Sequence, residues 1–168
     1  FANLYEEEND IETKEFVKEF QIDTDFELLF PDEYINNITE RLSLYNELGS
    51  VKNNSELEAY EIRLIDRFGV LPKEAVSLLN SVRIKWKAKQ IGLERLILKQ
   101  NKMIGYFIAN PQSKFYESPV FTKVLDYMQK HPLAAKLSEK NDRLRVIYSN
   151  VNSLTEAFNH LDKVLEVD

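Results

Sequence analysis

Leu64-Ile65-Asp66-Arg67-Phe68-Gly69-Val70-Leu71-Pro72 contains the signals for the end of one helix and the start of another. Leu64, Ile65 and Phe68 recur at helical spacing, which predicts a buried stripe. Gly69 follows the last periodic residue, where a left-handed helix cap is easiest without a Cβ atom. Pro72 suits the first turn of a helix, which does not need its N–H group. The stretch therefore predicts two helices joined by a tight turn.

Asp66 and Arg67 lie on the side of this helix away from the stripe, and Arg63 lies one turn before Arg67. A charged group held by two helices and a tight turn suits recognition better than catalysis. A second interpretation stays open. Arg63 and Asp66 are three residues apart, so they could form an ordinary pair within the helix, worth about 0.2–0.5 kcal/mol.

Charge is distributed unevenly along the chain. Residues 1–33 contain 12 acids and 2 bases, whereas residues 34–168 contain 16 acids and 20 bases. The overall charge of −6 gives little support for phosphate-backbone binding by the whole domain, although a local basic patch is compatible with the mildly basic remainder. The acidic block Glu6-Glu7-Glu8-Asn9-Asp10 predicts a solvated linker over residues 1–14, with a docked acidic segment as the alternative.

Length and composition fit one globular domain over residues 15–168. The absence of cysteine excludes disulfides and Cys-based zinc sites, and a reducing cytoplasm is the expected location. No apolar run is long enough to span a membrane, and the beginning of the sequence lacks a signal-peptide pattern. Because the sequence begins at Phe1 and not Met, we expect a piece of a longer protein.

The first part of the chain predicts one strand and three helices. Apolar residues alternate with polar ones between Phe16 and Phe30, which indicates a half-buried strand bent near Thr24. We expect the helices to run from Asp32 to Leu48, from a capping box at Ser55 and Glu58 to Phe68, and from Lys73 to Ile91. The expected core positions of the first and third helices are Ile35, Ile38, Leu42, Tyr45 and Leu48, and Val76, Leu79, Val82 and Trp86.

After Gly92 the pattern changes to short β-rich runs. They predict two hairpins, formed by residues 95–99 with 103–108 and by residues 135–139 with 143–148, each followed by a helix. These helices begin at Ser118-Pro119 and at a capping box of Ser153 and Glu156. The fold class is therefore α+β, with a strand, three helices, and two β-hairpins each followed by a helix, on a mostly antiparallel sheet.

The end of the third predicted helix carries four bases, Arg83, Lys85, Lys87 and Lys89, interleaved with Trp86. Basic residues around an aromatic ring can bind single-stranded nucleic acid. The other interpretation is a solvated helix face whose cations favour the helix dipole, and we prefer it. Two function classes remain: an interaction module that regulates a larger protein, which we favour, and an accessory nucleic-acid-binding domain. Weak DNA binding at physiological salt would favour the first.

Three motifs together resemble the C-terminal domain of the bacterial transcription-repair coupling factor. They are Phe30-Pro31-Asp32-Glu33-Tyr34-Ile35, Arg41-Leu42-Ser43-Leu44-Tyr45, and the stretch at residues 64–72. The resemblance runs in order from about Phe16 to the end and is densest between Phe30 and Gly92.

This resemblance implies a regulatory domain of a multidomain ATP-driven DNA translocase that removes stalled RNA polymerase and recruits nucleotide excision repair. In that family the domain packs on the UvrB-like N-terminal module of the same protein. It masks the surface that binds UvrA until the motor engages. The family's charged contacts fall on the helix end that contains Arg63, Asp66 and Arg67, which are the expected partner-binding residues. The domain itself is expected to need no cofactor and to bind no membrane.

No catalytic constellation is visible in the sequence. There is no Gly-rich phosphate loop, and His131 and His160 are too far apart in sequence to form a recognisable metal motif.

We therefore expect the purified chain to hydrolyse no ATP, because it has no group to hold or activate a nucleotide. A steady-state ATPase assay with and without DNA measures this. Robust turnover by the pure chain would contradict the expectation.

Overall fold

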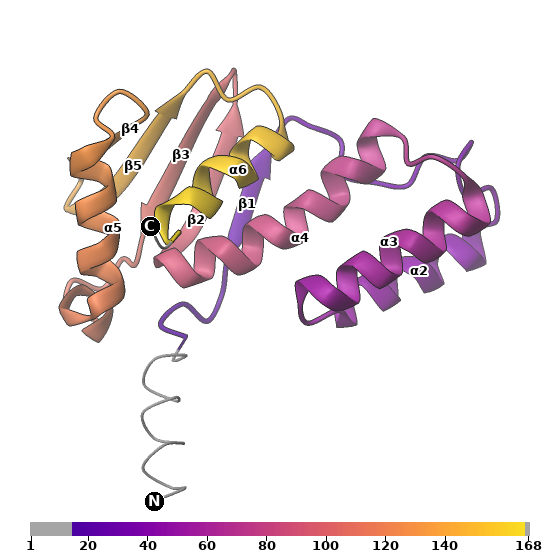
Figure 1. Ribbon diagram of the computed structural model, residues 1–168, viewed down its shortest axis with the longest axis horizontal. Helices are drawn as coiled ribbons and strands as arrows, with labels where there is room; N and C mark the ends of the chain where they lie inside the picture. Colours follow the sequence, from indigo (N-terminus) through magenta and orange to yellow (C-terminus); the bar gives the residue numbers. More distant parts are fainter. Residues whose placement is uncertain (1–14, 167–168) are drawn as a thin grey trace, which may run out of the picture.

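The fold is arranged around a five-stranded sheet with the strand order β1-β2-β3-β5-β4. It is seen in a computed structural model that describes residues 15–166 (Figure 1). The strands are β1 (Gln21–Thr24), β2 (Leu93–Lys99), β3 (Lys102–Phe107), β4 (Ala135–Lys140) and β5 (Arg143–Ser149). The helices are α2 (Ile38–Ser50), α3 (Asn54–Phe68), α4 (Lys73–Ile91), the 3-10 helix η1 (Lys114–Glu117), α5 (Pro119–Lys130) and α6 (Leu154–Val164). This order confirms the predicted α+β class.

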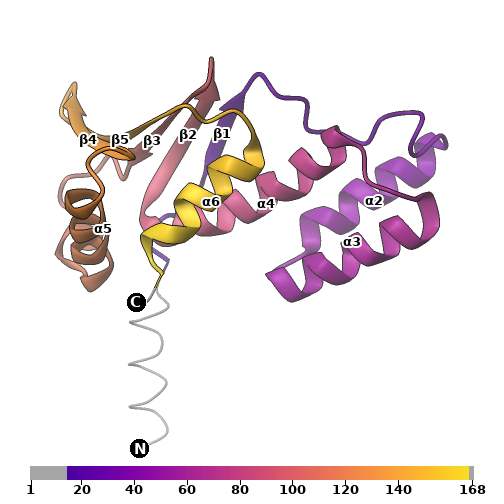
Figure 2. The same cartoon turned by 45° about the horizontal axis from the view of Figure 1, so that its top comes forward.

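The sheet is mostly antiparallel, since only β1 pairs in parallel, with β2, among its four pairings. Helices α4, α5 and α6 lie on one side of it (Figures 1 and 2). Helices α2 and α3 stand apart from the sheet and pack beside the first half of α4. Helix α4 thus joins the sheet to the pair of helices that carries the predicted recognition residues.

Two hydrophobic clusters correspond to these two parts. The larger lies between the sheet and helices α4–α6 and includes Ile84, Ala88 and Ile91 of α4. The smaller lies among α2, α3 and the beginning of α4, and includes Ala75 and Leu79 of α4. Because one helix contributes to both clusters, its apolar residues are spread around its circumference.

The predicted first strand is too long, since only residues 21–24 pair with the sheet. The Thr24 side-chain oxygen accepts a hydrogen bond from the Phe26 N–H at 3.2 Å and closes a turn that ends the strand. Apolar residues on both sides still contribute to the two clusters. Val17 is fully buried, and Phe30 packs in the smaller cluster. The alternating pattern therefore marks burial more than strand pairing.

The predicted start of the first helix at Asp32 is wrong. Pro31 instead accepts backbone hydrogen bonds from Tyr34 and Ile35, which form a turn. The Asn37 side chain then caps α2 by accepting from the Glu40 N–H at 3.0 Å. The predicted stripe is also partly wrong, because Ile38 and Leu42 are 64% and 57% exposed.

The capping box of α3 lies at Asn53 and Glu56, not at Ser55 and Glu58 as predicted. The Asn53 side chain accepts from the Glu56 N–H, and the Glu56 carboxylate accepts from the Lys52 N–H. In α4 the predicted core is right for Leu79, whereas Val76 is 37% exposed. The fully buried positions Ile84, Ala88 and Ile91 were not predicted because α4 lacks a single apolar face.

The second half of the fold follows the predictions closely. Both hairpins form, and their turns place Gln100, Asn101, Asn141 and Asp142 at positive φ. Asn and Asp adopt this conformation most easily after Gly, which explains their use here. Ser118 and Ser153 cap α5 and α6 as predicted.

The predicted acidic linker at residues 1–14 lies outside the described residues. No helix in residues 15–166 has the length and apolar character needed to cross a membrane.

Strand alternation gives a matched test of this sheet. Val146 is 1% exposed and faces the larger cluster, whereas its neighbour Ile147 is half-buried on the other face, beside Lys136. We expect Val146→Asp to unfold the protein, because an unpaired buried carboxylate costs several kcal/mol against a total stability of about 5–15 kcal/mol. Ile147→Asp should leave a cooperative melt, measured by circular dichroism. A parent-like melt for Val146→Asp would show that β5 is assigned to the wrong face.

Candidate functional site

The end of α3 is fixed by contacts with the segment before α2. Gly69 has φ 90° and donates its N–H to the Ile65 carbonyl at 2.9 Å. Its own carbonyl accepts a hydrogen bond from the Tyr34 hydroxyl at 2.8 Å, and the Tyr34 and Phe68 rings lie 5.7 Å apart. Pro72 immediately precedes α4. The turn predicted from Gly69 and Pro72 is therefore present, and Tyr34 holds it in place.

Arg63 and Arg67 both bridge to α2. Arg63 forms an ion pair with Glu47, and Arg67 forms one with Glu40. Both arginine side chains are more than 60% exposed, so these pairs lie at the surface. The structure thus does not contain the intrahelical Arg63–Asp66 pair that the spacing allowed.

Asp66 differs from the two arginines. It is exposed, and its side chain forms no hydrogen bond or ion pair with any residue in the described part of the chain. The arginines next to it already have carboxylate partners on α2. Asp66 therefore carries the uncompensated charge of this surface.

A shallow hollow of about 520 Å³ lies between α2 and α3 beside these charges. Tyr60 lies at its base, 1% exposed, and donates its hydroxyl hydrogen to the Leu44 carbonyl at 2.7 Å. Burial raises the pKa of Tyr60 above its usual value, and the negative charge of Glu47 raises it further. The hollow is lined by Leu44, Glu47, Tyr60, Arg63, Leu64, Asp66, Arg67 and Phe68. All three predicted partner-binding residues thus surround one concave surface.

Two exposed isoleucines also lie beside Asp66. Ile62 is 66% exposed one turn before it, and Ile65 is 44% exposed next to it. The sequence prediction placed Ile65 in the buried stripe and did not consider Ile62. The exposure of both isoleucines could have been predicted, since neither lies on the buried stripe formed by Leu57, Tyr60 and Leu64. We call Ile62, Arg63, Ile65, Asp66 and Arg67 the α3 surface.

The four bases at the end of α4 do not form an open basic patch. Arg83 is 17% exposed and donates hydrogen bonds to Asn54, Asn80 and Glu61. Lys87 pairs with Asp162 at 3.3 Å, and Lys89 donates to the Lys18 carbonyl at 3.1 Å. Lys85 alone among the four has no such partner in the described residues. Their main role in the structure is to connect α4 to α3, α6 and the first described segment.

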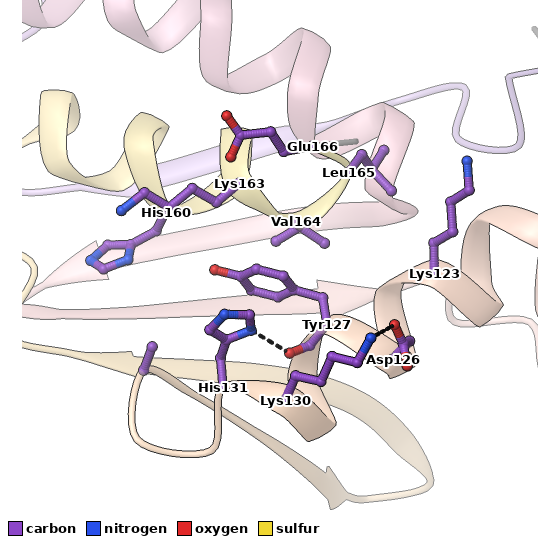
Figure 3. A pocket seen from close by; sticks show the side chains of 11 residues that line it. Lys123, Asp126, Tyr127, Lys130, His131, His160, Lys163, Val164, Leu165 and Glu166 are labelled. Carbon is purple, nitrogen blue, oxygen red and sulfur yellow. Dashed lines mark hydrogen bonds and ion pairs between the residues drawn. The ribbon is translucent and has the colours of Figure 1, made fainter. Parts of the chain in front are cut away.

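A groove of about 520 Å³ separates α5 from α6 and contains both histidines (Figure 3). The His131 ring stacks on Tyr127 at 4.1 Å, and its Nδ1 lies 2.9 Å from the Tyr127 carbonyl oxygen. Burial lowers the pKa of His160, and Lys163 lowers it further. No group of three His, Cys, Asp or Glu side chains able to hold a metal ion occurs in residues 15–166.

The exposed ion pairs of the α3 surface give a stability prediction. Arg63→Ala and Arg67→Ala should each lower the free energy of unfolding by no more than about 1 kcal/mol, because surface pairs contribute little. Leu64→Ala, on the buried side of the same helix, should cost about 2–5 kcal/mol. Urea denaturation measures all three. An Arg67→Ala cost equal to that of Leu64→Ala would mean that the arginines hold the fold together.

Comparisons with known proteins agree on one family. A model of the TRCF domain family matches residues 24–118. The transcription-repair-coupling factor of Escherichia coli is 41% identical over 68 residues, which are 40% of this chain and 6% of that protein. The Buchnera aphidicola factor is 31% identical over 134 residues, 80% of this chain and 16% of that protein. The Rickettsia typhi factor is 26% identical over 166 residues, 98% of this chain and 14% of that protein.

A crystal structure of the C-terminal domain of transcription-repair coupling factor has the same fold. Its TM-score is 0.65 at 19% sequence identity, over 88% of this chain and 95% of that one. The chain spans only a small part of the length of its curated relatives, 6% of the first and 16% of the Buchnera one. The family match covers more than half of the chain, including the whole of α2, α3 and α4. The chain therefore belongs to the TRCF domain family.

Proposed function

We propose that this domain is an autoinhibitory module that holds its parent protein closed. The α3 surface would dock on the UvrB-like N-terminal module of the same protein and cover the site that UvrA binds in nucleotide excision repair. The observation that carries the proposal is the uncompensated charge of Asp66, held rigidly between two exposed isoleucines on the family's recognisable helix end.

The chemistry of this surface specifies the partner. Glu40 and Glu47 already neutralise Arg67 and Arg63. The negative charge of Asp66 is left unpaired, so a partner should bring a cation to it. Ile62 and Ile65 would supply apolar contact on either side. Specific interfaces combine apolar contacts at their centre with polar and charged contacts around them. The partner surface should therefore present a basic side chain next to an apolar area.

The energies required for such a latch are modest. A tethered contact has an effective concentration on the order of millimolar, and a dissociation constant of ~10 μM would keep it closed about 100 to 1. That ratio corresponds to about 2.7 kcal/mol. Losing one member of a desolvated charge pair costs about 2–5 kcal/mol, which is enough to open the latch. The domain can thus regulate without a catalytic group of its own.

The alternative function, nucleic-acid binding through Arg83, Lys85, Lys87 and Lys89, gains no support from the contacts of these residues. Arg83, Lys87 and Lys89 are engaged by other parts of the domain. We therefore place the regulatory interaction first.

Replacing Asp66 and Arg67 by Ala in the full-length parent should expose UvrA binding. If the latch is closed about 100 to 1, its opening tightens the apparent UvrA affinity by up to about 100-fold. Binding is measured by titrating UvrA against the purified parent. Lys114→Ala with Glu117→Ala is a matched control, since it also removes one cation and one anion from exposed positions. Unchanged UvrA affinity in a folded Asp66/Arg67 variant would contradict the proposal.

A further inference from the structure

The face of the sheet opposite α4, α5 and α6 has no described helix over it (Figure 2). Strand pairing aligns its outward side chains in rows. One row runs Arg95, Tyr106, Arg145 and Ser138 across β2, β3, β5 and β4. The next row runs Ile97, Ile104, Ile147 and Lys136, and the three isoleucines are half-buried. We call this surface the open face.

The open face is strongly basic although the chain as a whole is acidic. Alternation and register place seven bases on it: Arg95, Lys99, Lys102, Lys136, Lys140, Arg143 and Arg145. Two of these bases pair with an acid: Arg95 binds Asp23, and Arg143 binds Glu94. The overall charge of −6 thus conceals a local excess of positive charge on one face. An excess of this kind attracts a polyanion.

Arg145 is the centre of this excess. Its side chain forms no hydrogen bond or ion pair with any residue in the part of the chain that the structure describes. The Nε atom of its guanidinium is buried and has no hydrogen-bond partner in the described residues. The guanidinium of Arg145 therefore keeps hydrogen-bonding capacity that no described side chain uses. Arginine presents its donors in a planar fork that matches a phosphate group.

Tyr106 adds an aromatic surface between Arg95 and Arg145. The Arg143 guanidinium lies over its ring at 5.3 Å and is held there by hydrogen bonds to the Phe107 carbonyl at 3.2 Å and to Glu94 at 3.1 Å. An aromatic ring and a flat guanidinium are the surfaces on which unpaired bases stack. The row of isoleucines beside them continues the apolar surface.

From these observations we propose that the open face binds single-stranded nucleic acid. The basic side chains around Arg145 would bind the phosphates, and a nucleobase would stack against Tyr106 and Arg143. The stacking surface of Tyr106 and Arg143 favours a single strand over a duplex, because the bases of a duplex are already stacked and paired. An acidic peptide would use the cations but not the stacking surface. The site is separate from the α3 surface, so this proposal does not depend on the proposed docking.

The test is fluorescence anisotropy of a labelled oligothymidylate of about 15 nucleotides with the full chain. Binding is measured at about 50 mM salt and above, because phosphate contacts weaken steeply with salt. Arg145→Gln and Tyr106→Leu should each weaken binding at least about fivefold, and Arg145→Gln should also reduce the slope of log K against log salt by about 0.7. Lys136→Gln with Lys140→Gln, at exposed positions, should weaken binding without affecting the melt.

Lys123→Gln, which removes an exposed cation from α5, is the matched control and should bind like the parent. Three kinds of result would overturn the proposal. The first is that the parent does not bind at low salt, or that the open-face variants bind as tightly as the parent does. The second is loss of binding in Lys85→Gln with Lys89→Gln, which would place the site at the end of α4. The third is equal competition by a polyglutamate peptide of the same charge, which would assign the face to an acidic protein.

Discussion

Helix α4 is the element on which both halves of this structure depend, because it is buried on two sides at once. Ala75 and Leu79 pack with α2 and α3, and Ile84, Ala88 and Ile91 pack under the sheet. At about 1.5 Å per residue, its 19 residues form a rod of roughly 28 Å. A helix of this length fixes the position of one hydrophobic cluster relative to the other. Gly92 ends it at φ 98°, and any Cβ atom there would lie 2.1 Å from the Phe115 ring.

The α3 surface derives its geometry from this arrangement. Helix α3 is connected to α4 by the Gly69–Pro72 turn, and Tyr34 holds the turn from the other side. The smaller hydrophobic cluster fixes the direction of the α2–α3 pair, and Arg63 and Arg67 add surface ion pairs to α2. What remains unpaired is Asp66, with Ile62 and Ile65 exposed around it. A surface with fixed shape and an unmet charge loses little conformational entropy on docking, which favours a tethered, reversible contact.

Much of the second half of the fold could be predicted from sequence, because local signals decide it. Ser118, Ser153 and the Asn141-Asp142 turn act within a few residues, and the structure uses them as expected. The errors are concentrated where tertiary packing overrides periodicity. Ile38 and Leu42 have helical spacing but face solvent, and α4 shows no single stripe because it packs on two sides.

The candidate site was predictable only in part, for the same physical reason. Spacing placed Asp66 and Arg67 together on one exposed side. It could not show that carboxylates of α2 pair with Arg63 and Arg67, which leaves Asp66 without a cationic partner. The charge segregation of the open face was also hidden, since its bases come from four strands separated in sequence. Neighbours across elements, which a single sequence does not display, determine which charges remain available for a partner.

We propose that the α3 surface is the contact by which this domain binds the N-terminal module of its parent. The most direct measurement is a titration of the isotope-labelled chain with the purified UvrB-like module, followed by amide chemical shifts. We expect the largest shifts at residues 62–69 and at the facing positions of α2, with saturation at concentrations of about 10 μM. Shifts confined to the α5–α6 groove or to the open face of the sheet, or no shifts at all, would contradict it.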